Sequence, residues 1–137
     1  FFAAIRDYYA SFRDSSVLTN DFAAVVSHHA NRPMDWFFEQ WLLQPGYPRI
    51  EAEWGYRADL GTLVLDVRQA QPHEWGEFSF RLPVLVRLEG GGQELAVVRI
   101  GGREWSHRIP LAGVPAGIVL DPDGTLLLEI LDLRRSR

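Results

Sequence analysis

The chain has 137 residues, a formal net charge of −4, no cysteine and 14 basic residues, all of them arginine. A hydrophobic fraction of 47% excludes disorder as the main state, and the length predicts one domain of ordinary size or a small domain with an appendage. The missing cysteine excludes disulfides and thiolate zinc sites and slightly favours a cytoplasmic location. The mild acidity and the lack of an apolar run of about 20 residues predict neither a nucleic acid nor a membrane as partner.

The first segment has the apolar spacing of an amphipathic α-helix. Its aromatic and aliphatic residues recur on one face of a 3.6-residue helical period. They are Phe1, Phe2, Ile5, Tyr8, Tyr9 and Phe12. The sequence begins inside this pattern without a capping residue, so we expect it to be a piece of a longer protein.

Two further helices are predicted before residue 48. Thr19 or Asn20 is suited to cap the second helix, and Asn31 with Pro33 closes it. The third helix carries Trp36 and Leu43 away from its main stripe, so it is apolar on nearly two sides and is expected to be buried or to contact a neighbour. Its main stripe consists of Met34, Phe37, Phe38, Trp41 and Leu42.

From Arg49 onward apolar and polar residues alternate with the period of a β-strand. The clearest strand covers residues 78–89, where Pro83 removes one ladder donor and predicts an edge or bent strand. The last two strands are expected at residues 117–121 and 125–131, as a pair joined by the turn at residues 121–124. Together these segments predict about seven short strands with glycine-rich turns, which is typical of a β-sandwich.

The expected fold class is α+β by segregation. A short helical segment of about three helices occupies residues 1–48, and an all-β, immunoglobulin-like sandwich occupies residues 49–137.

Five short motifs, in this order, resemble zinc metallopeptidases of the aminopeptidase N family. They are Tyr8-Tyr9, Thr19-x-Asp21-Phe22, Phe37-Phe38-x-Gln40-Trp41, Gly46-x-Pro48 and Val67-x-Gln69-x-Gln71. In that family such a segment ends the helical catalytic domain and a β-sandwich follows. The resemblance therefore implies that residues 1–48 are the terminal helices of a catalytic domain, in a parent protein that removes N-terminal residues from peptides with a zinc-bound water.

The chemistry of that family is missing from this sequence. It requires His-Glu-x-x-His on a helix, with two zinc-binding histidines and a glutamate general base. The similar run from His73 to Glu77 has glutamate in place of the second histidine, and Pro72 and Gly76 predict a loop there. We expect no catalytic, cofactor-binding or metal-binding residue in this chain and an inactive protein by itself, with zinc implied only for the parent.

Other candidate ligands have simpler structural explanations. His28 and His29, with Asp35, lack metal-ligand spacing and are expected to be one surface and one core histidine. Asp121-x-Asp123-Gly124 lacks the later acidic ligands of a calcium loop and predicts a turn. Residues 134–137 are expected to form a solvated tail.

Tryptophan faces suggest a carbohydrate platform as a second explanation. Trp54 and Trp105 alternate with apolar neighbours and are expected in the core, whereas Trp75 is expected in an exposed loop.

The favoured function is therefore structural support for the parent catalytic domain. The expected partner is the rest of that domain, with self-association through the exposed helical stripe as a further possibility. The alternative is a stand-alone immunoglobulin-like module that binds a protein or glycan.

Overall fold

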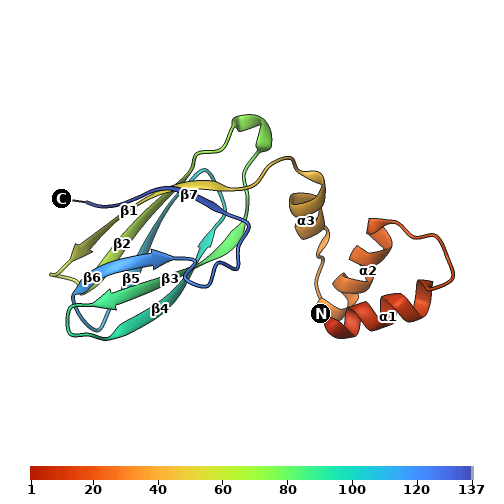
Figure 1. Cartoon of the computed structure of the whole chain (residues 1–137), viewed down its shortest axis with the longest axis horizontal. Coiled ribbons are helices and arrows are strands. Elements are labelled where there is room, and N and C mark those ends of the chain that lie inside the picture. The colour runs from red at the N-terminus through yellow and green to blue at the C-terminus, as the bar shows by residue number, and fades with distance from the viewer. Residues whose placement is uncertain (137) are drawn as a thin grey trace. The chain divides into compact units, whose positions relative to one another are not determined.

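The computed structural model describes residues 1–136, which form two compact units, one from Phe1 to Pro45 and one from Gly46 onward (Figure 1). The first unit is helical and the second is a sandwich of two β-sheets, so the predicted α+β class is confirmed. No helix in the described part of the chain is long and apolar enough to span a membrane.

The helical unit contains α1 (Phe2–Phe12), α2 (Thr19–Ala30) and α3 (Asp35–Phe38). The residue preceding α2 is Leu18, whose N–H donates to the Asp21 carboxylate at 2.8 Å, so the predicted cap at Thr19 or Asn20 falls one or two residues late. Asn31 ends the helix in the left-handed conformation, with φ of 51°, as the sequence predicts.

A π-helix follows α3 directly at Glu39–Leu43 and interrupts the predicted third helix. Its signature is the hydrogen bond from the Gln44 N–H to the Glu39 carbonyl five residues earlier, at 2.8 Å. Because this turn is wider than an α-helical turn, the residues that face the interior differ from those on the apolar stripe predicted for an α-helix. Gln40 is buried, whereas Leu42 on the predicted apolar stripe is exposed.

The aromatic rings of the helical unit form a row rather than an enclosed core. Tyr8 lies 5.0 Å from Phe22, measured between ring centroids, and Phe22 lies 5.7 Å from Phe38. The buried hydrophobic residues of this unit are only Ala4 and Ala23 within the described part of the chain. Most of the predicted α1 stripe is exposed to solvent; these residues are Phe1, Phe2, Ile5 and Tyr9.

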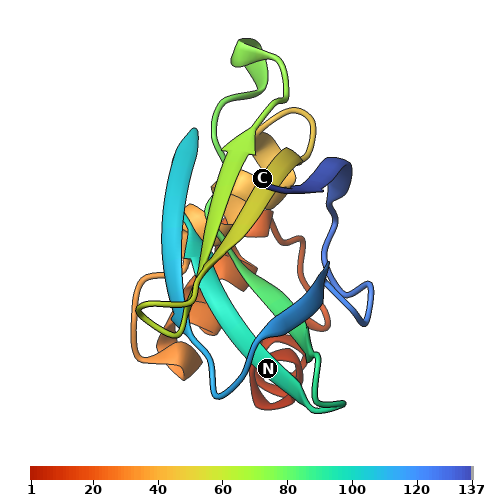
Figure 2. The same cartoon turned by 90° about the vertical axis from the view of Figure 1, so that its left-hand side faces the viewer.

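The sandwich consists of a four-stranded and a three-stranded sheet whose strands cross each other in the view of Figure 2. The four-stranded sheet has the order β5-β2-β1-β7, and the three-stranded sheet has the order β4-β3-β6. The strands are β1 (Arg49–Arg57), β2 (Thr62–Gln69), β3 (Phe80–Leu88), β4 (Gln93–Ile100), β5 (Glu104–Pro110), β6 (Pro115–Leu120) and β7 (Glu129–Arg135). Neighbouring strands are antiparallel except β1 and β7, which run parallel.

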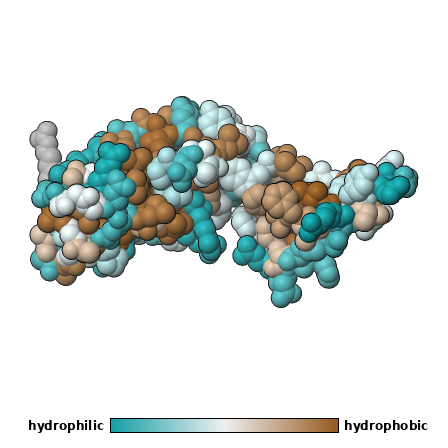
Figure 3. Space-filling view, turned by 60° about the horizontal axis from the view of Figure 1, so that its bottom comes forward, coloured by the Kyte–Doolittle hydropathy of each residue, from teal (hydrophilic) through white to brown (hydrophobic). Residues whose placement is uncertain are grey.

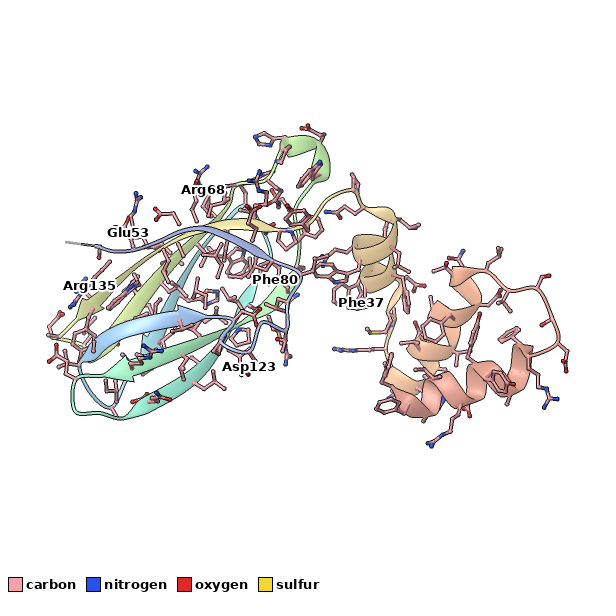
Figure 4. The ribbon with its side chains drawn as sticks, viewed as in Figure 1. Phe37, Glu53, Arg68, Phe80, Asp123 and Arg135 are labelled. Carbon is pink, nitrogen blue, oxygen red and sulfur yellow. The ribbon has the colours of Figure 1, made fainter. Side chains whose placement is uncertain are left out.

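Alternate residues of β1, β2 and β3 fill the space between the sheets, as the two-residue period predicts. Figure 4 shows Phe80 pointing into this space, while Glu53 and Arg68 project from the opposite face of the four-stranded sheet. The largest fully buried apolar side chains of the core are Phe78, Ile50, Leu63, Leu65, Leu82 and Ile100.

Of the edge or bent strand predicted from Pro83, the edge position is wrong, because β3 is the central strand of its sheet. The Pro83 carbonyl accepts the Asp121 N–H at 2.8 Å, so its ring nitrogen faces the last rung of the β3–β6 ladder. Asp121 has φ of 44° and turns the chain away at that rung. Proline has no N–H to donate, and Pro83 therefore lies at the position where the β3–β6 pairing ends.

The predicted pairing of the last two strands is also wrong. β6 and β7 belong to different sheets, since the chain crosses between the sheets after Leu120 and β7 adds to β1. The predicted solvated tail is strand as far as Arg135, whose guanidinium lies 5.0 Å from the centroid of the Trp54 ring. Ser136 donates its N–H to the Trp54 carbonyl at 2.8 Å. Arg137, the last residue of the predicted tail, lies outside the described residues.

Candidate functional site

The two glutamines of the Val-x-Gln-x-Gln motif form a buried polar network. The Gln69 side-chain amide donates at 2.8 Å to the carbonyls of Phe78 and Gly102, and its oxygen accepts the Phe78 N–H at 2.9 Å. Gln71 donates to the Gln69 oxygen at 2.8 Å and to the Gly76 carbonyl at 2.9 Å. The network therefore ties the segment before β3 and the β4–β5 connection to the end of β2. Its role is structural.

Gly46 is required by the packing of Trp75. A Cβ built on Gly46 would lie 2.2 Å from Trp75 Cδ2, and the residue has φ of 78°. Trp75 also packs against Tyr47 with ring centroids 5.5 Å apart, so it is half-buried rather than exposed as predicted. The Gly-x-Pro motif thus leaves the space into which the Trp75 ring packs.

His73 and Glu77, the nearest approach to a zinc motif, are separated by a cation. The motif segment contains only a single 3₁₀ turn at His73–Trp75. Arg103 places Nη2 3.3 Å from His73 Nδ1 and Nε 3.9 Å from Glu77 Oε1. Its Nη1 donates at 2.9 Å to the Gln71 carbonyl, which fixes the guanidinium in this position. A positive charge held between the two side chains opposes metal binding there.

His29 is not the core histidine that its position on α2 predicts. Its Nε2 lies 2.7 Å from Asp7 Oδ2, and this pair joins α2 to α1 at the surface. Among residues 1–136, no group of three histidine or acidic side chains is arranged to hold a metal ion.

Asp121 organises the predicted turn after β6. Its carboxylate accepts the N–H and hydroxyl of Thr125, at 3.0 and 3.1 Å, and the N–H of Leu126 at 3.0 Å. Partial burial raises the pKa of Asp121, but the hydrogen bonds from Leu126 and Thr125 together outweigh it and hold the pKa below its usual value. Backbone groups thus occupy the oxygens that a calcium ion would need.

The tryptophans do not assemble a sugar-binding platform. Trp54 is buried in the core, as predicted. Trp105 is 39% exposed, contrary to prediction, and its ring stacks on His107 with centroids 5.6 Å apart and an angle of 14° between the planes. It lies on the edge strand β5, and alternation alone does not distinguish an edge strand from a central one. Trp36 on α3 is exposed as well.

A shallow groove of about 480 Å³ crosses the outer face of the four-stranded sheet. Charged side chains dominate it, and most are paired across the strands. Arg68 Nη2 lies 2.6 Å from Glu51 Oε2, and Arg134 Nε lies 2.9 Å from Glu53 Oε2. The remaining acidic residues of the groove are Asp66, Glu104 and Asp132.

The groove contains no histidine, hydroxyl–base pair or metal ligand set that would support catalysis; its lining includes one hydroxyl, that of Ser106. The groove is not among the features predicted from the sequence, although the pattern of charged residues indicates it. Charged residues outside the core alternate with core residues at Glu51 and Glu53 of β1 and at Asp66 and Arg68 of β2, and antiparallel pairing brings these four into register.

This combination of a short helical unit and a two-sheet sandwich is a fold that occurs within an aminopeptidase. The chain is similar to the crystal structure of Legionella pneumophila aminopeptidase A in complex with aspartic acid, with a TM-score of 0.71 and 13% sequence identity. The similarity covers 93% of this chain but only 15% of that chain, and at this identity it concerns the fold alone. No model of a known protein family matches the sequence, and no curated protein matches it.

Proposed function

We propose that this chain is the non-catalytic C-terminal part of an aminopeptidase N-like zinc metallopeptidase, in which it supports the catalytic domain. The observation that carries the proposal is the similarity to an aminopeptidase over 93% of this chain, more than either compact unit supplies by itself. The five ordered motifs favour the aminopeptidase N family over other peptidases.

The helical unit supports the same proposal. Its aromatic α1 face is exposed: the exposed fractions of Phe2 and Tyr9 are 76% and 67%. Burying one such side chain is worth about 1.5–3 kcal/mol, so an unpartnered face of this kind is a substantial loss for a unit of this size. Packing against the preceding helices of a catalytic domain would recover that free energy.

The coding sequence upstream of Phe1 provides the first test. We expect an in-frame His-Glu-x-x-His followed by a further glutamate, which would bind the zinc implied for the parent. A start codon immediately before Phe1 would contradict the proposal and would favour the stand-alone module.

The second test compares the upstream catalytic segment expressed with and without this chain. We expect hydrolysis of an aminoacyl chromogenic substrate only when the catalytic segment and this chain are both present. This chain alone should give only background hydrolysis, which a chelator does not change. Phe2→Ser with Tyr9→Ser should lower the activity of the complex, whereas Asp14→Ser, at an exposed side chain just beyond the end of α1, should leave it unchanged. Full activity of the catalytic segment without this chain would refute the supporting role.

The placement of the tryptophans does not favour glycan binding, because Trp54 is buried and Trp105 stacks on a histidine. Sedimentation distinguishes self-association through the α1 face from packing of that face against a catalytic domain. A concentration-dependent dimer abolished by Phe2→Ser would show that a second copy, rather than a catalytic domain, covers this face.

A further inference from the structure

The outer face of the three-stranded sheet combines exposed apolar side chains with arginines. Leu95 and Val97 on β4 are 63% and 57% exposed, although both belong to a well-formed strand. Arg81 and Arg87 on β3 and Arg99 on β4 share their side of the sheet by strand alternation. We call this surface the arginine-rimmed face; its apolar members are Pro83, Leu85, Leu95, Val97 and Val119.

The three arginines make no ion pair with any residue of the described chain, which contrasts with Arg68 and Arg134 on the other sheet. Arg81 and Arg99 are moreover directly opposite each other in the β3–β4 register. Like charges in such a pair destabilise a sheet by up to about 1 kcal/mol unless an anion lies between them. The face therefore has a positive charge that the described residues do not neutralise.

One edge of β4 is also free for pairing. The Pro83 carbonyl faces β6, so the N–H and C=O groups of its neighbours Leu82 and Val84 face β4. These groups pair with Val98 and Ala96, and the N–H and C=O groups of Leu95 and Val97 therefore point away from β3. In the sheet as described, β4 has no neighbour on that side. Among residues 1–136, a hydrogen bond to this edge is described at the Arg99 carbonyl, which lies 2.7 Å from His107 Nε2.

We propose that β4 accepts an extended acidic segment of a partner protein as an additional strand. Main-chain hydrogen bonds would form with Leu95 and Val97, and apolar side chains of the segment would cover the exposed apolar members of the face. Carboxylates of the segment would pair with Arg99, with Arg81 alongside. Figure 3 shows hydrophobic side chains bordered by hydrophilic ones on the surface of the sandwich unit.

The charges favour an acidic partner over a second copy of this chain. Pairing of two β4 edges would place the arginines of both copies on one face without any carboxylate. The free edge likewise favours a polypeptide over an anionic membrane, because lipid headgroups do not satisfy a row of alternating N–H and C=O groups. The proposal does not depend on the peptidase assignment.

A fluorophore-labelled synthetic peptide of about ten residues tests the proposal by anisotropy against the whole chain. Valine and glutamate take turns at every second position, so that both lie on the face that meets Leu95, Val97 and Arg99, and serine fills the positions between them. We expect saturable binding that weakens with salt, as ion pairs at an exposed surface are screened. The matched peptide of valine and lysine should bind at least tenfold more weakly. Equal binding of both peptides, or binding of neither, overturns the proposal, as does recruitment to phosphatidylserine vesicles without peptide binding.

Variants separate the two components of the site. Arg99→Glu should weaken the valine–glutamate peptide at least tenfold, whereas Arg108→Glu, an exposed arginine on edge strand β5, should change its affinity less than twofold. Val97→Pro removes an outward N–H that no ladder bond uses, so the fold should persist while peptide affinity falls at least tenfold. Near-ultraviolet circular dichroism verifies the fold of each variant. Unchanged affinity in Val97→Pro would refute strand addition.

Discussion

Replacing Gln69 by leucine is the sharpest test of how the sandwich is held together. Gln69 is fully buried, and leucine has a similar size without polar atoms. The substitution removes the hydrogen bonds that the Gln69 side chain makes with the Phe78 N–H and carbonyl in the protein interior. Each buried group left unpaired costs about 1–3 kcal/mol, so these two groups alone predict a loss of about 2–6 kcal/mol.

The other two contacts of Gln69 add less to this loss. The Gly102 carbonyl is only partly buried and can bind water, and Gln71 retains its hydrogen bond to Gly76. We therefore expect the free energy of unfolding to fall by about 4 kcal/mol, a large part of the about 5–15 kcal/mol typical of a domain.

Urea unfolding followed by near-ultraviolet circular dichroism measures this change. The matched control is Gln93→Leu on β4, where the side chain is exposed and the expected change is within about 0.5 kcal/mol. A loss below about 1 kcal/mol in Gln69→Leu would refute the reasoning, because it would show that the two Phe78 groups find other partners.

Three further substitutions test other parts of the sandwich. Gly46→Ala should lose about 3 kcal/mol in the same unfolding assay, because the new Cβ overlaps the Trp75 ring, whereas Gly91→Ala, with a similar positive φ but open space, should lose about 1 kcal/mol. Asp121→Ala should lose about 1 kcal/mol at pH 7. The difference from the native chain should begin to shrink as the pH falls below about 4 and should be lost only below the lowered pKa of Asp121, since the ionised carboxylate is the form that the fold stabilises; a difference that grows on acidification would contradict this. Arg134→Ala should change the free energy by less than about 0.5 kcal/mol, because its ion pair with Glu53 is exposed; a loss above 1 kcal/mol would show that the pair matters more than exposure suggests.

The sequence predicts those features that depend on local periodicity. The positions of α1 and α2, the left-handed Asn31 and the buried faces of β1 to β3 all follow from spacing and residue type. The sequence does not predict the π-helix, because the same apolar residues fit an α-helical period and the wider turn is defined by the hydrogen bond from the Gln44 N–H to the Glu39 carbonyl.

Features that depend on distant partners could not be predicted in this way. The pattern around residues 121–124 fits a hairpin equally well whether the next strand pairs with β6 or crosses to β1, because a turn residue controls the direction of the chain and not its partner. Trp105 was placed in the core because alternation does not reveal that β5 is an edge strand. The unpaired arginines of the arginine-rimmed face became visible only once the register placed Arg81 opposite Arg99.

The parallel pairing of β7 with β1 has a consequence for synthesis of the chain. β1 is the first strand of the sandwich to leave the ribosome and β7 the last, and their register joins Arg49 to Glu129. Arg49 also binds Glu129 through a side-chain hydrogen bond at 2.6 Å, and this bond raises the pKa of Arg49.

One edge of β1 therefore stays open until nearly the whole sandwich has been made. Contacts between such distant segments form slowly, and an unpaired edge is a site where nascent chains pair with each other. A chain interrupted between β6 and β7 would keep that edge permanently exposed. Pairing of β7 thus covers the open edge of β1, and nascent chains of this sandwich aggregate more readily before β7 emerges from the ribosome than after it.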